Sequence, residues 1–303
     1  MKRQCGYPGP AESSRPPAVS PASLDEVHDI PAAKLSVRDT LERFEIVPSK
    51  RFGQNFLHDP AVCARIVARV SAAPGSSVLE IGPGLGALTV PLLDGGAHVT
   101  AVEVDRRLAE FLHERLADRD TFRLHQGNIL EVNLEEVAGD ARILVGNLPY
   151  SITGPVLSRL VEHADRFDSC VIMLQREVGA RLTAPAGGKA IGAIAVLLRL
   201  LYRIQKCFEV GTGAFVPRPE IVSVVLRLER IPGASLPAGL RDAVNLAYRH
   251  RRKMLRKTLG GVVASEEALA EALVELGHVA RARPEDLDPE DWPRLLARVR
   301  ASS

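Results

Sequence analysis

The stretch "GNLPYS" at residues 146–151 combines groups that could activate an aromatic amine. The exocyclic amine of adenine is a poor nucleophile because its lone pair is delocalised into the ring. Two acceptors that bind both amine hydrogens would rotate this lone pair out of the ring plane, and the Asn147 side-chain oxygen and the Leu148 carbonyl oxygen are the candidates. Pro149 would fix the backbone that presents this carbonyl, and Tyr150 offers a flat face for stacking. The stretch predicts catalysis by positioning and electrostatic alignment, without a charged general base.

The stretch "EIGPGLGA" at residues 80–87 has the glycine spacing of a nucleotide-binding loop. Gly82 and Gly84 permit a tight turn and a close approach of a ligand to the backbone. Glu103 follows about twenty residues later, where a carboxylate can accept hydrogen bonds from both hydroxyls of a ribose. These residues predict a nucleoside-containing cofactor.

Two cofactors fit this loop, and Glu80 favours one of them. Gly82-x-Gly84-x-x-Ala87 satisfies the dinucleotide fingerprint, so an NAD-dependent oxidoreductase is an alternative, and a plain tight turn is another. The Glu80 carboxylate would face the negative charge of a pyrophosphate, whereas it suits a ligand that carries a sulfonium and an amino group. We therefore expect S-adenosylmethionine and a methyltransferase.

The elements that must position these groups alternate between apolar strands and helical stretches from about residue 77 onward. This alternation is typical of a parallel sheet in a doubly wound α/β domain, in which ligands bind beyond the carboxyl ends of the strands. The predicted strands are 77–81, 98–104, 121–126, 142–147, 170–175, 202–210 and 223–230. The carboxyl ends of the first four predicted strands carry candidate groups. At the third strand these are Gly127-Asn128-Ile129.

Three parts are predicted along the chain. Residues 1–40 are rich in proline and are expected to be a disordered extension. Residues 41–232 would form the methyltransferase domain, and 233–303 a second domain made of helices. The helices expected in the last part are about 240–249, 251–260, 265–277 and 286–299.

Composition limits the class of protein and its compartment. The chain of 303 residues is 46% hydrophobic and 25% charged, as in soluble globular proteins. No apolar run approaches the roughly 18–20 residues of a membrane span, and 190–202 is expected to be buried core. The four cysteines form no C-x-x-C pair, which argues against a zinc site and a disulfide framework. We expect a cytoplasmic monomer with no metal and no membrane partner.

The stretch 241–257 carries seven Lys/Arg residues against one Asp, although the net charge of the whole chain is only +2. A solvated helix face is the default interpretation of such a run. A face that binds phosphates is the alternative.

Five stretches together resemble the ribosomal RNA adenine N6-dimethyltransferases, in particular the small-subunit, KsgA-like branch of this family. They are "RFGQNFL" (51–57), "EIGPGLGALT" (80–89), "GNLPYSITGP" (146–155), "FVPRPEIVSVVLRL" (215–228) and "RRKMLRKTL" (251–259). Dinucleotide enzymes lack the first of these blocks. The resemblance implies a Rossmann-like class I methyltransferase sheet followed by a small all-helical domain.

The resemblance also implies a set of site residues and a substrate. It implies an S-adenosylmethionine site at Asn55, Leu57, Gly82, Gly84, Glu103, Asn128 and Asn147. It implies an acceptor pocket formed by Asn147, Leu148, Pro149 and Tyr150, with Phe215 as a second stacking ring. The implied RNA-phosphate contacts are Arg251, Arg252, Lys253, Arg256 and Lys257. The implied substrate is a pair of adjacent adenosines in a hairpin near the 3′ end of small-subunit (16S) rRNA, within the immature small ribosomal subunit.

The chain departs from the family pattern at three positions. Asn128 stands where Asp is usual, and its amide oxygen can still accept a hydrogen bond, so we expect weakened rather than lost cofactor binding. Ser151 stands where Asn is commoner, and Val222 replaces a polar residue before Ser223.

Two further functions remain open at this point. One is a large-subunit (23S) rRNA adenine methyltransferase of the macrolide-resistance type, which shares this chemistry. The other is a ribosome-assembly factor that keeps the fold for RNA binding without turnover.

Overall fold

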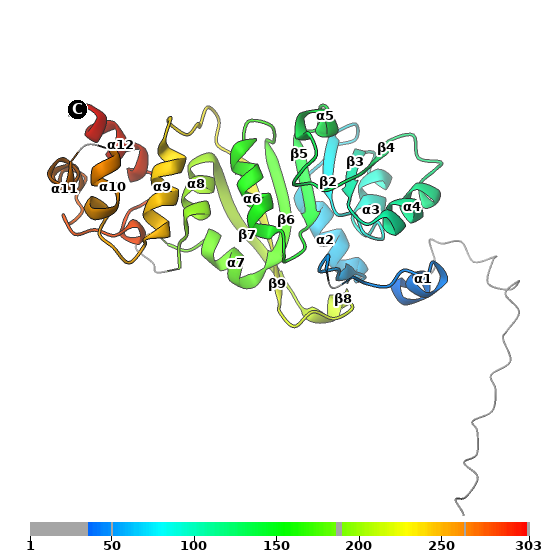
Figure 1. Cartoon of the computed structure of the whole chain (residues 1–303). Helices are drawn as coiled ribbons and strands as arrows, with labels where there is room; N and C mark the ends of the chain where they lie inside the picture. Colours follow the sequence, from blue (N-terminus) through cyan, green and yellow to red (C-terminus); the bar gives the residue numbers. More distant parts are fainter. Residues whose placement is uncertain (1–35, 50, 186–189, 264, 302–303) are drawn as a thin grey trace, which may run out of the picture. The chain divides into compact units, whose positions relative to one another are not determined.

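A mostly parallel sheet forms the centre of the computed structural model, which describes residues 36–49, 51–185, 190–263 and 265–301 (Figure 1). Among these residues the main sheet has seven strands in the order β4-β3-β2-β5-β6-β9-β7. The strands are β2 (Ser77–Ile81), β3 (His98–Glu103), β4 (Phe122–Gln126), β5 (Ile143–Asn147), β6 (Ser169–Gln175), β7 (Tyr202–Val210) and β9 (Ser223–Arg230). The predicted strands are therefore confirmed to within one residue at each end, and so is the α/β fold class.

Strand β9 runs antiparallel to its neighbours, whereas a parallel sheet was predicted. Strands β4, β3, β2, β5 and β6 are parallel, whereas β9 lies between β6 and β7 and runs antiparallel to both. The connection 211–222 between β7 and β9 contains only the short 3-10 helix η2 (Thr212–Ala214) and strand β8 (Phe215–Val216). Parallel neighbours need a long crossover, usually through a helix, and this connection has none, so β9 returns beside β7 in the opposite direction.

Helices cover both faces of the sheet and create two cores. The helices before the C-terminal region are α1 (Val37–Arg43), α2 (Pro60–Val70), α3 (Thr89–Asp94), α4 (Arg106–Arg115), α5 (Leu134–Ala138), α6 (Thr153–Glu162), α7 (Arg176–Leu182) and α8 (Ala193–Leu201). Leu144 of β5 belongs to the core that contains side chains of α6 and α8, whereas the next residue, Val145, belongs to the core that contains side chains of α2, α3 and α4. Successive strand residues point to opposite faces, so a strand buried on both faces is apolar along most of its length.

A second, two-stranded sheet joins segments that lie far apart in the sequence. Strand β1 (Phe56–Leu57) pairs antiparallel with β8, and Leu57 lies opposite Phe215. Two-residue strands have no periodicity, so the sequence patterns did not predict this sheet. It places the "RFGQNFL" block beside Phe215.

The described residues after β9 contain helices and no further strands, as expected. They are α9 (Leu240–Arg249), α10 (Leu255–Val263), α11 (Glu266–Glu275), the 3-10 helix η3 (Pro284–Asp286) and α12 (Asp291–Ala301). The predicted helix 251–260 begins only at Leu255, because residues 251–253 form a turn in which Lys253 N–H donates to the His250 carbonyl at 2.7 Å. Leu240 and Val244 of α9 share one hydrophobic core with α6 and α8. The predicted boundary between 232 and 233 remains a prediction.

The start of the described chain lies inside the predicted Pro-rich extension. Residues 1–35 of that extension lie outside the described residues. Ser36 caps α1 through a capping box: its hydroxyl accepts from Asp39 N–H at 3.2 Å, and the Asp39 carboxylate accepts from Ser36 N–H at 3.3 Å. The first helix therefore begins four residues before the predicted boundary at 41.

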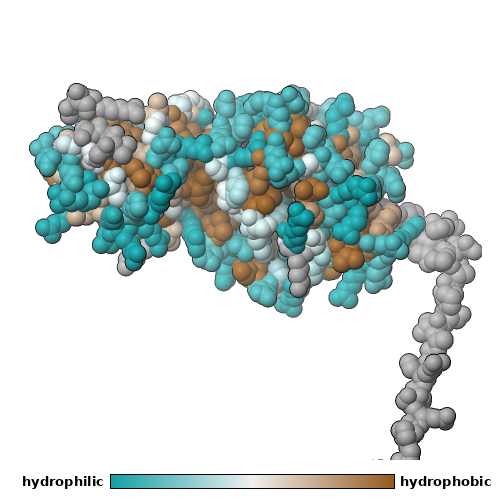
Figure 2. Space-filling model, in the orientation of Figure 1, coloured by the Kyte–Doolittle hydropathy of each residue, from teal (hydrophilic) through white to brown (hydrophobic). Residues whose placement is uncertain are grey.

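None of the helices in the described ranges has the length and hydropathy needed to cross a bilayer. The apolar run 190–202 corresponds to α8, whose residues Val196 and Leu198 are fully buried, as predicted. On the face drawn in Figure 2, hydrophilic residues cover most of the surface and hydrophobic ones appear in smaller patches.

Candidate active site

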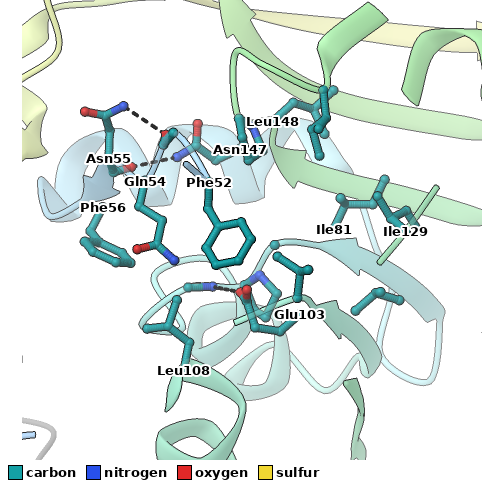
Figure 3. A pocket seen from close by; sticks show the side chains of 18 of the residues that line it. Phe52, Gln54, Asn55, Phe56, Ile81, Glu103, Leu108, Ile129, Asn147 and Leu148 are labelled. Atoms are coloured by element: carbon teal, nitrogen blue, oxygen red, sulfur yellow. Dashed lines mark hydrogen bonds between the residues drawn. The ribbon is translucent and has the colours of Figure 1, made fainter. Parts of the chain in front are cut away.

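A cavity of about 200 Å³ lies where the carboxyl ends of β2, β3, β4 and β5 meet. The segment 51–57 and Phe215 complete its walls. In Figure 3 Asn147, Glu103 and the ring of Phe52 surround the same space. The cavity brings together the strand ends that the sequence patterns singled out. Of the predicted site residues, those that line it are Asn55, Leu57, Gly82, Gly84, Glu103, Asn128, Asn147, Leu148, Pro149, Tyr150 and Phe215.

The glycine loop after β2 leaves space for a ligand. Gly82 and Gly84 have φ values of +64° and +59°, a region in which side chains other than glycine are strained. A Cβ atom at Gly84 would lie 3.2 Å from the Phe56 ring, whereas a Cβ atom at Gly82 would meet no atom within 4 Å. Gly84 is therefore needed for packing against β1, and Gly82 for its backbone conformation and open surroundings.

Glu103 is a buried carboxylate held at the end of β3 by the backbone. Its Oε2 accepts from Gly84 N–H at 3.2 Å and its Oε1 accepts from Asp105 N–H at 3.0 Å. Burial raises the pKa of Glu103, and these two hydrogen bonds oppose that effect. A carboxylate can accept about four hydrogen bonds, so the group can still accept from a ligand.

Glu80 lines the same cavity, but its hydrogen bond comes from a side chain rather than from the backbone. Its carboxylate is 2% exposed and accepts from the Thr89 hydroxyl at 2.6 Å. Burial raises the pKa of Glu80 to about 7, the Thr89 hydrogen bond opposes this, and the charge of Glu103 adds to it. Without a ligand, Glu80 therefore changes charge near neutral pH.

Asn147 is oriented by the segment that precedes β1. Its Nδ2 donates to the Asn55 carbonyl at 3.2 Å, which leaves Oδ1 without a donor among the described residues. Leu148 N–H donates to the Met173 carbonyl at 2.9 Å, while no described residue donates to the Leu148 carbonyl oxygen. The Pro149 carbonyl accepts from the Thr153 hydroxyl and from Ile152 N–H, both at 3.1 Å. Two neighbouring acceptors therefore remain free on a backbone that is fixed on both sides.

Two aromatic rings border these acceptors. The Tyr150 hydroxyl lies 3.1 Å from the Ser223 hydroxyl at the start of β9, which fixes the ring from its far end. Phe215 is 3% exposed and is held by its pairing with Leu57. Tyr150 lies in the turn after β5 and Phe215 lies in β8, but both rings border one cavity.

The segment before β1 is tied across the cavity to the end of β3. Gln54 Nε2 donates to the Asp105 carboxylate at 3.0 Å, and Gln54 Oε1 accepts from Ser49 N–H at 2.8 Å. Burial alone would raise the pKa of Asp105, but the hydrogen bonds from Arg107 and Gln54 lower it. Sequence reasoning missed this tie, although Gln54 lies within the block "RFGQNFL" and Asp105 follows Glu103 by two residues.

Asn128 already uses both ends of its amide. Its Oδ1 accepts from Leu130 N–H at 3.1 Å and its Nδ2 donates to Glu131 at 2.8 Å. The loop is held from outside by Arg159 of α6, which donates to the Leu130 carbonyl at 2.6 Å and to the Val132 carbonyl at 2.9 Å. Arg159 was not predicted, because a single cation in an amphipathic helix gives no sequence signal.

The predicted RNA-binding residues do not line the cavity. Arg251, Arg252 and Lys253 are exposed on the turn between α9 and α10. Lys257 is paired with Glu266 at 2.7 Å, and Arg256 is only partly exposed. Three of the five predicted cations therefore point to solvent without a carboxylate partner among the described residues.

Comparison with known proteins identifies the family. Residues 48–286 match the family described as ribosomal RNA adenine dimethylase. This chain belongs to that family. Membership confirms the resemblance seen in the sequence and the enzyme class, an rRNA methyltransferase, and it removes the NAD-dependent oxidoreductase as an alternative.

Relatives of the dimethylase family match nearly their full length. The ribosomal RNA small subunit methyltransferase A of Pseudomonas putida is 39% identical over 262 residues, which cover 84% of this chain and 96% of the relative. The protein of the same name from Methylococcus capsulatus is 41% identical over 255 residues, or 82% of this chain and 96% of the relative.

Solved structures share the fold of this dimethylase. A dimethyladenosine transferase from Plasmodium falciparum superposes with a TM-score of 0.68 at 21% identity, covering 80% of this chain and 96% of that one. The 23S rRNA methyltransferase ErmE superposes with a TM-score of 0.66 at 26% identity, covering 81% and 99%. The first of these likenesses shows the fold alone.

Proposed function

We propose that this dimethylase transfers methyl groups from S-adenosylmethionine to N6 of two adjacent adenosines in a hairpin near the 3′ end of small-subunit rRNA. The observation that carries the proposal is the orientation of Asn147. Its amide nitrogen is occupied by the Asn55 carbonyl, so its oxygen stays available beside the free Leu148 carbonyl. The relatives that match this chain over most of their length are named as small-subunit enzymes.

The cavity suits S-adenosylmethionine in its charges and in its space. Glu103 would accept from the ribose hydroxyls with the lone pairs that the backbone leaves free. Gly82 offers close backbone approach, and Asn55, Leu57 and Asn128 line the remaining walls. Glu80 would be ionised by a neighbouring cation, since an opposite charge nearby favours the charged form of a carboxyl. When bound, the cofactor supplies an electrophilic methyl group on a positively charged sulfur.

The residues after β5 would prepare the acceptor amine. Asn147 Oδ1 and the Leu148 carbonyl accept its two hydrogens and draw the nitrogen lone pair out of conjugation with the ring. Tyr150 and Phe215 hold the base by stacking, which is worth about 1–3 kcal/mol per base. The alkylated amine then releases its proton to water, so no side chain needs to act as a base. The chain's contribution is orientation and electrostatic alignment.

The RNA outside the pocket would be held by exposed cations. Arg251, Arg252 and Lys253 lie on one exposed turn and suit phosphate contacts, with Arg256 and Lys257 on the adjoining helix. We expect the enzyme to act in the cytoplasm as a monomer on the immature small ribosomal subunit.

Methylation of purified subunits tests the substrate. Small and large subunits are prepared from cells that lack the enzyme and are incubated with the protein and labelled S-adenosylmethionine. We expect label on N6-dimethyladenosine in small-subunit RNA only. Label confined to the large subunit would instead support an enzyme of the macrolide-resistance type, and absence of label in both would support an assembly factor without turnover.

The role of Asn147 is tested by Asn147→Ala. Loss of one aligned acceptor should lower kcat by about 10²–10³-fold, the range seen when one preorganised hydrogen-bonding group is removed from an active site. Retention of subunits on the protein should stay close to that of the unchanged chain, because no described phosphate-binding candidate contacts Asn147. An unchanged rate of methyl transfer would contradict the role given to this residue.

A further inference from the structure

We propose that four arginines on α2, β7 and β9 form a second surface that binds the phosphate backbone of structured ribosomal RNA. The four residues, which we call the arginine face, are Arg65, Arg69, Arg203 and Arg227. The inference rests on the proposed function, because it assigns a further contact to the same RNA substrate. None of the four lines the active-site cavity.

Helix α2 presents two of these cations together. Arg65 and Arg69 are four residues apart and exposed, while Ile66 and Val70 are buried against the sheet. Residues at this spacing are neighbours on a helix surface, and like charges there are mutually unfavourable. Folding therefore gains nothing from placing both of them on this side of α2.

Strands β7 and β9 carry the other two cations beside α2. In the antiparallel register Arg203 lies opposite Glu229, and Arg227 lies opposite Gln205. Glu229 lies two residues after Arg227, and positions two apart on a strand share a face. Arg203, which lies opposite Glu229, is therefore on the same side of the sheet as Arg227. Arg227 Nη1 donates to the hydroxyl of Ser71, the C-cap residue of α2, at 3.3 Å, which shows that this is the side covered by α2.

Further contacts draw the helix and the strands into one patch. The guanidinium of Arg65 lies 3.9 Å from the centroid of the Phe208 ring on β7. Burial raises the pKa of the Cys207 thiol, while the charges of Arg69 and Arg227 act together to lower it. Both guanidinium groups therefore lie near one residue of β7.

The arginine face keeps most of its positive charge. Among the described residues the ion pairs reach only Arg227 of this set, through Glu229 at 2.9 Å. Arginines elsewhere on the surface are commonly neutralised, as in Arg119 with Asp94 at 2.7 Å and Arg142 with Asp168 at 2.7 Å. Four cations and one paired carboxylate leave a local excess of positive charge. Such a surface attracts an anionic partner.

The chemistry of these side chains fits phosphate groups of RNA. The guanidinium group presents a planar fork of donors that matches phosphate oxygens. Stacking on Phe208 and the bond to Ser71 hold two of the forks in place before binding. Strand β9 links the arginine face to the acceptor pocket, because Ser223 at its start contacts Tyr150 and Arg227 follows roughly 13 Å along the strand. RNA whose target bases occupy the pocket would therefore have phosphates within reach of this face.

The test compares two variants that lose the same charge. Arg65→Gln with Arg69→Gln removes two cations from the arginine face. Arg106→Gln with Arg119→Gln removes two cations that pair with Glu110 and Asp94 and lie at α4 and just after it, on the β4 side of the sheet. Binding of the full chain to immature small subunits is measured from about 50 to 200 mM salt, a range over which phosphate contacts dominate the change in affinity.

Each lost phosphate contact should lower the slope of log K against log salt concentration by about 1. We expect the slope of the first variant to fall by about 2. Its KM for subunits should rise at least about tenfold at the higher salt concentration, since counterion release scales with the number of contacts. The control variant should match the unchanged chain, and kcat at saturating subunit and the Kd for S-adenosylmethionine should be the same in all three proteins.

Three outcomes would overturn the inference. The first is an unchanged slope and KM in the first variant, and the second is an equal loss in both variants, which would reflect net charge alone. The third is weaker binding with an unchanged slope, which would place a protein rather than RNA against this face. If the unchanged chain methylates no small subunit, the proposed function fails instead, and Arg203→Gln with Arg227→Gln provides an independent second variant for the slope.

Discussion

Glu80 shows how a single buried carboxyl can serve a cationic ligand. Burial places its pKa at about 7, so about half of the molecules carry a protonated Glu80 at that pH before any ligand binds. The carboxylate form attracts a sulfonium and an amino group, whereas the neutral form does not. The group that favours S-adenosylmethionine over a dinucleotide is therefore also a group whose charge depends on pH.

We expect the affinity for S-adenosylmethionine to rise as pH increases through the pKa of Glu80. Between pH 6 and 8 the ionised fraction of a group with a pKa of about 7 grows about tenfold, so the affinity should increase by up to about tenfold and level off above this range. Calorimetric titration across this range measures it. Glu80→Gln keeps an acceptor for Thr89 but cannot ionise, so its affinity should be low and flat with pH. An unchanged pH profile in Glu80→Gln would contradict this role.

The stability of the unliganded protein provides the control for this residue. Because the folded-state pKa of Glu80 is raised from 4.5 to about 7, the folded state binds more protons than the unfolded state between these values. The contribution of Glu80 to the free energy of unfolding is therefore largest below pH 4.5 and is lost as pH rises to about 7, by at most on the order of 3 kcal/mol. Glu80→Gln should remove this part of the slope, which denaturant unfolding at several pH values can measure.

At the scale of elements, α6 connects the two halves of the candidate site. Its N-terminus follows the "GNLPYS" stretch, and its Arg159 donates to the carbonyls of Leu130 and Val132. These carbonyls belong to the loop that carries Asn128, whose amide is fixed by Leu130 N–H and Glu131. The helix therefore sets the position of the loop with Asn128, the proposed cofactor loop, relative to the proposed acceptor stretch at 146–151.

Replacing Arg159 should loosen the cofactor loop without touching the acceptors. Arg159→Met removes both hydrogen bonds, and we expect the KM for S-adenosylmethionine to rise about tenfold or more, since each part-buried carbonyl that loses a charged donor costs on the order of 1 kcal/mol. The kcat at saturating cofactor should change less than threefold. Arg159→Lys keeps the charge but loses the planar fork of donors, so it should recover part of the affinity, whereas Arg142→Met, which removes an exposed pair with Asp168, should leave KM unchanged. A fall in kcat with constant KM would contradict a positioning role.

The sequence patterns predicted the main elements well and the connections between them poorly. Strands β2, β5, β6 and β9 are buried along most of their length, so their ranges could be predicted from continuous apolar runs. The direction of β9, the pairing of β1 with β8 and the contacts of Arg159 depend on residues far apart in the chain. The same holds in the candidate site. Asn147 and Glu103 could be predicted because they lie at the ends of predicted strands, whereas the hydrogen bond between Gln54 and Asp105 could be seen only in the folded chain.

At the scale of the whole molecule, an rRNA enzyme of nearly balanced charge must bind RNA through local surfaces. The net charge of +2 over 303 residues provides little general attraction to phosphate. The turn after α9 concentrates Arg251, Arg252 and Lys253 in exposed positions instead. This turn and the arginine face lie on different elements, so their contributions to RNA binding should be largely additive.

The turn after α9 gives a prediction that separates RNA binding from folding. Replacing Arg251, Arg252 and Lys253 together by Gln should lower the slope of log K against log salt for immature small subunits by up to about 3, one for each lost phosphate contact. The Tm should stay within about 2 °C, because surface substitutions without a described partner usually change stability by less than about 0.5 kcal/mol. Lys257→Gln is the matched control, since Lys257 is already neutralised by Glu266 at 2.7 Å and should contribute less than one contact. A slope that falls as much in this single variant as in the triple variant would mean that α10, rather than the turn, lies against the RNA.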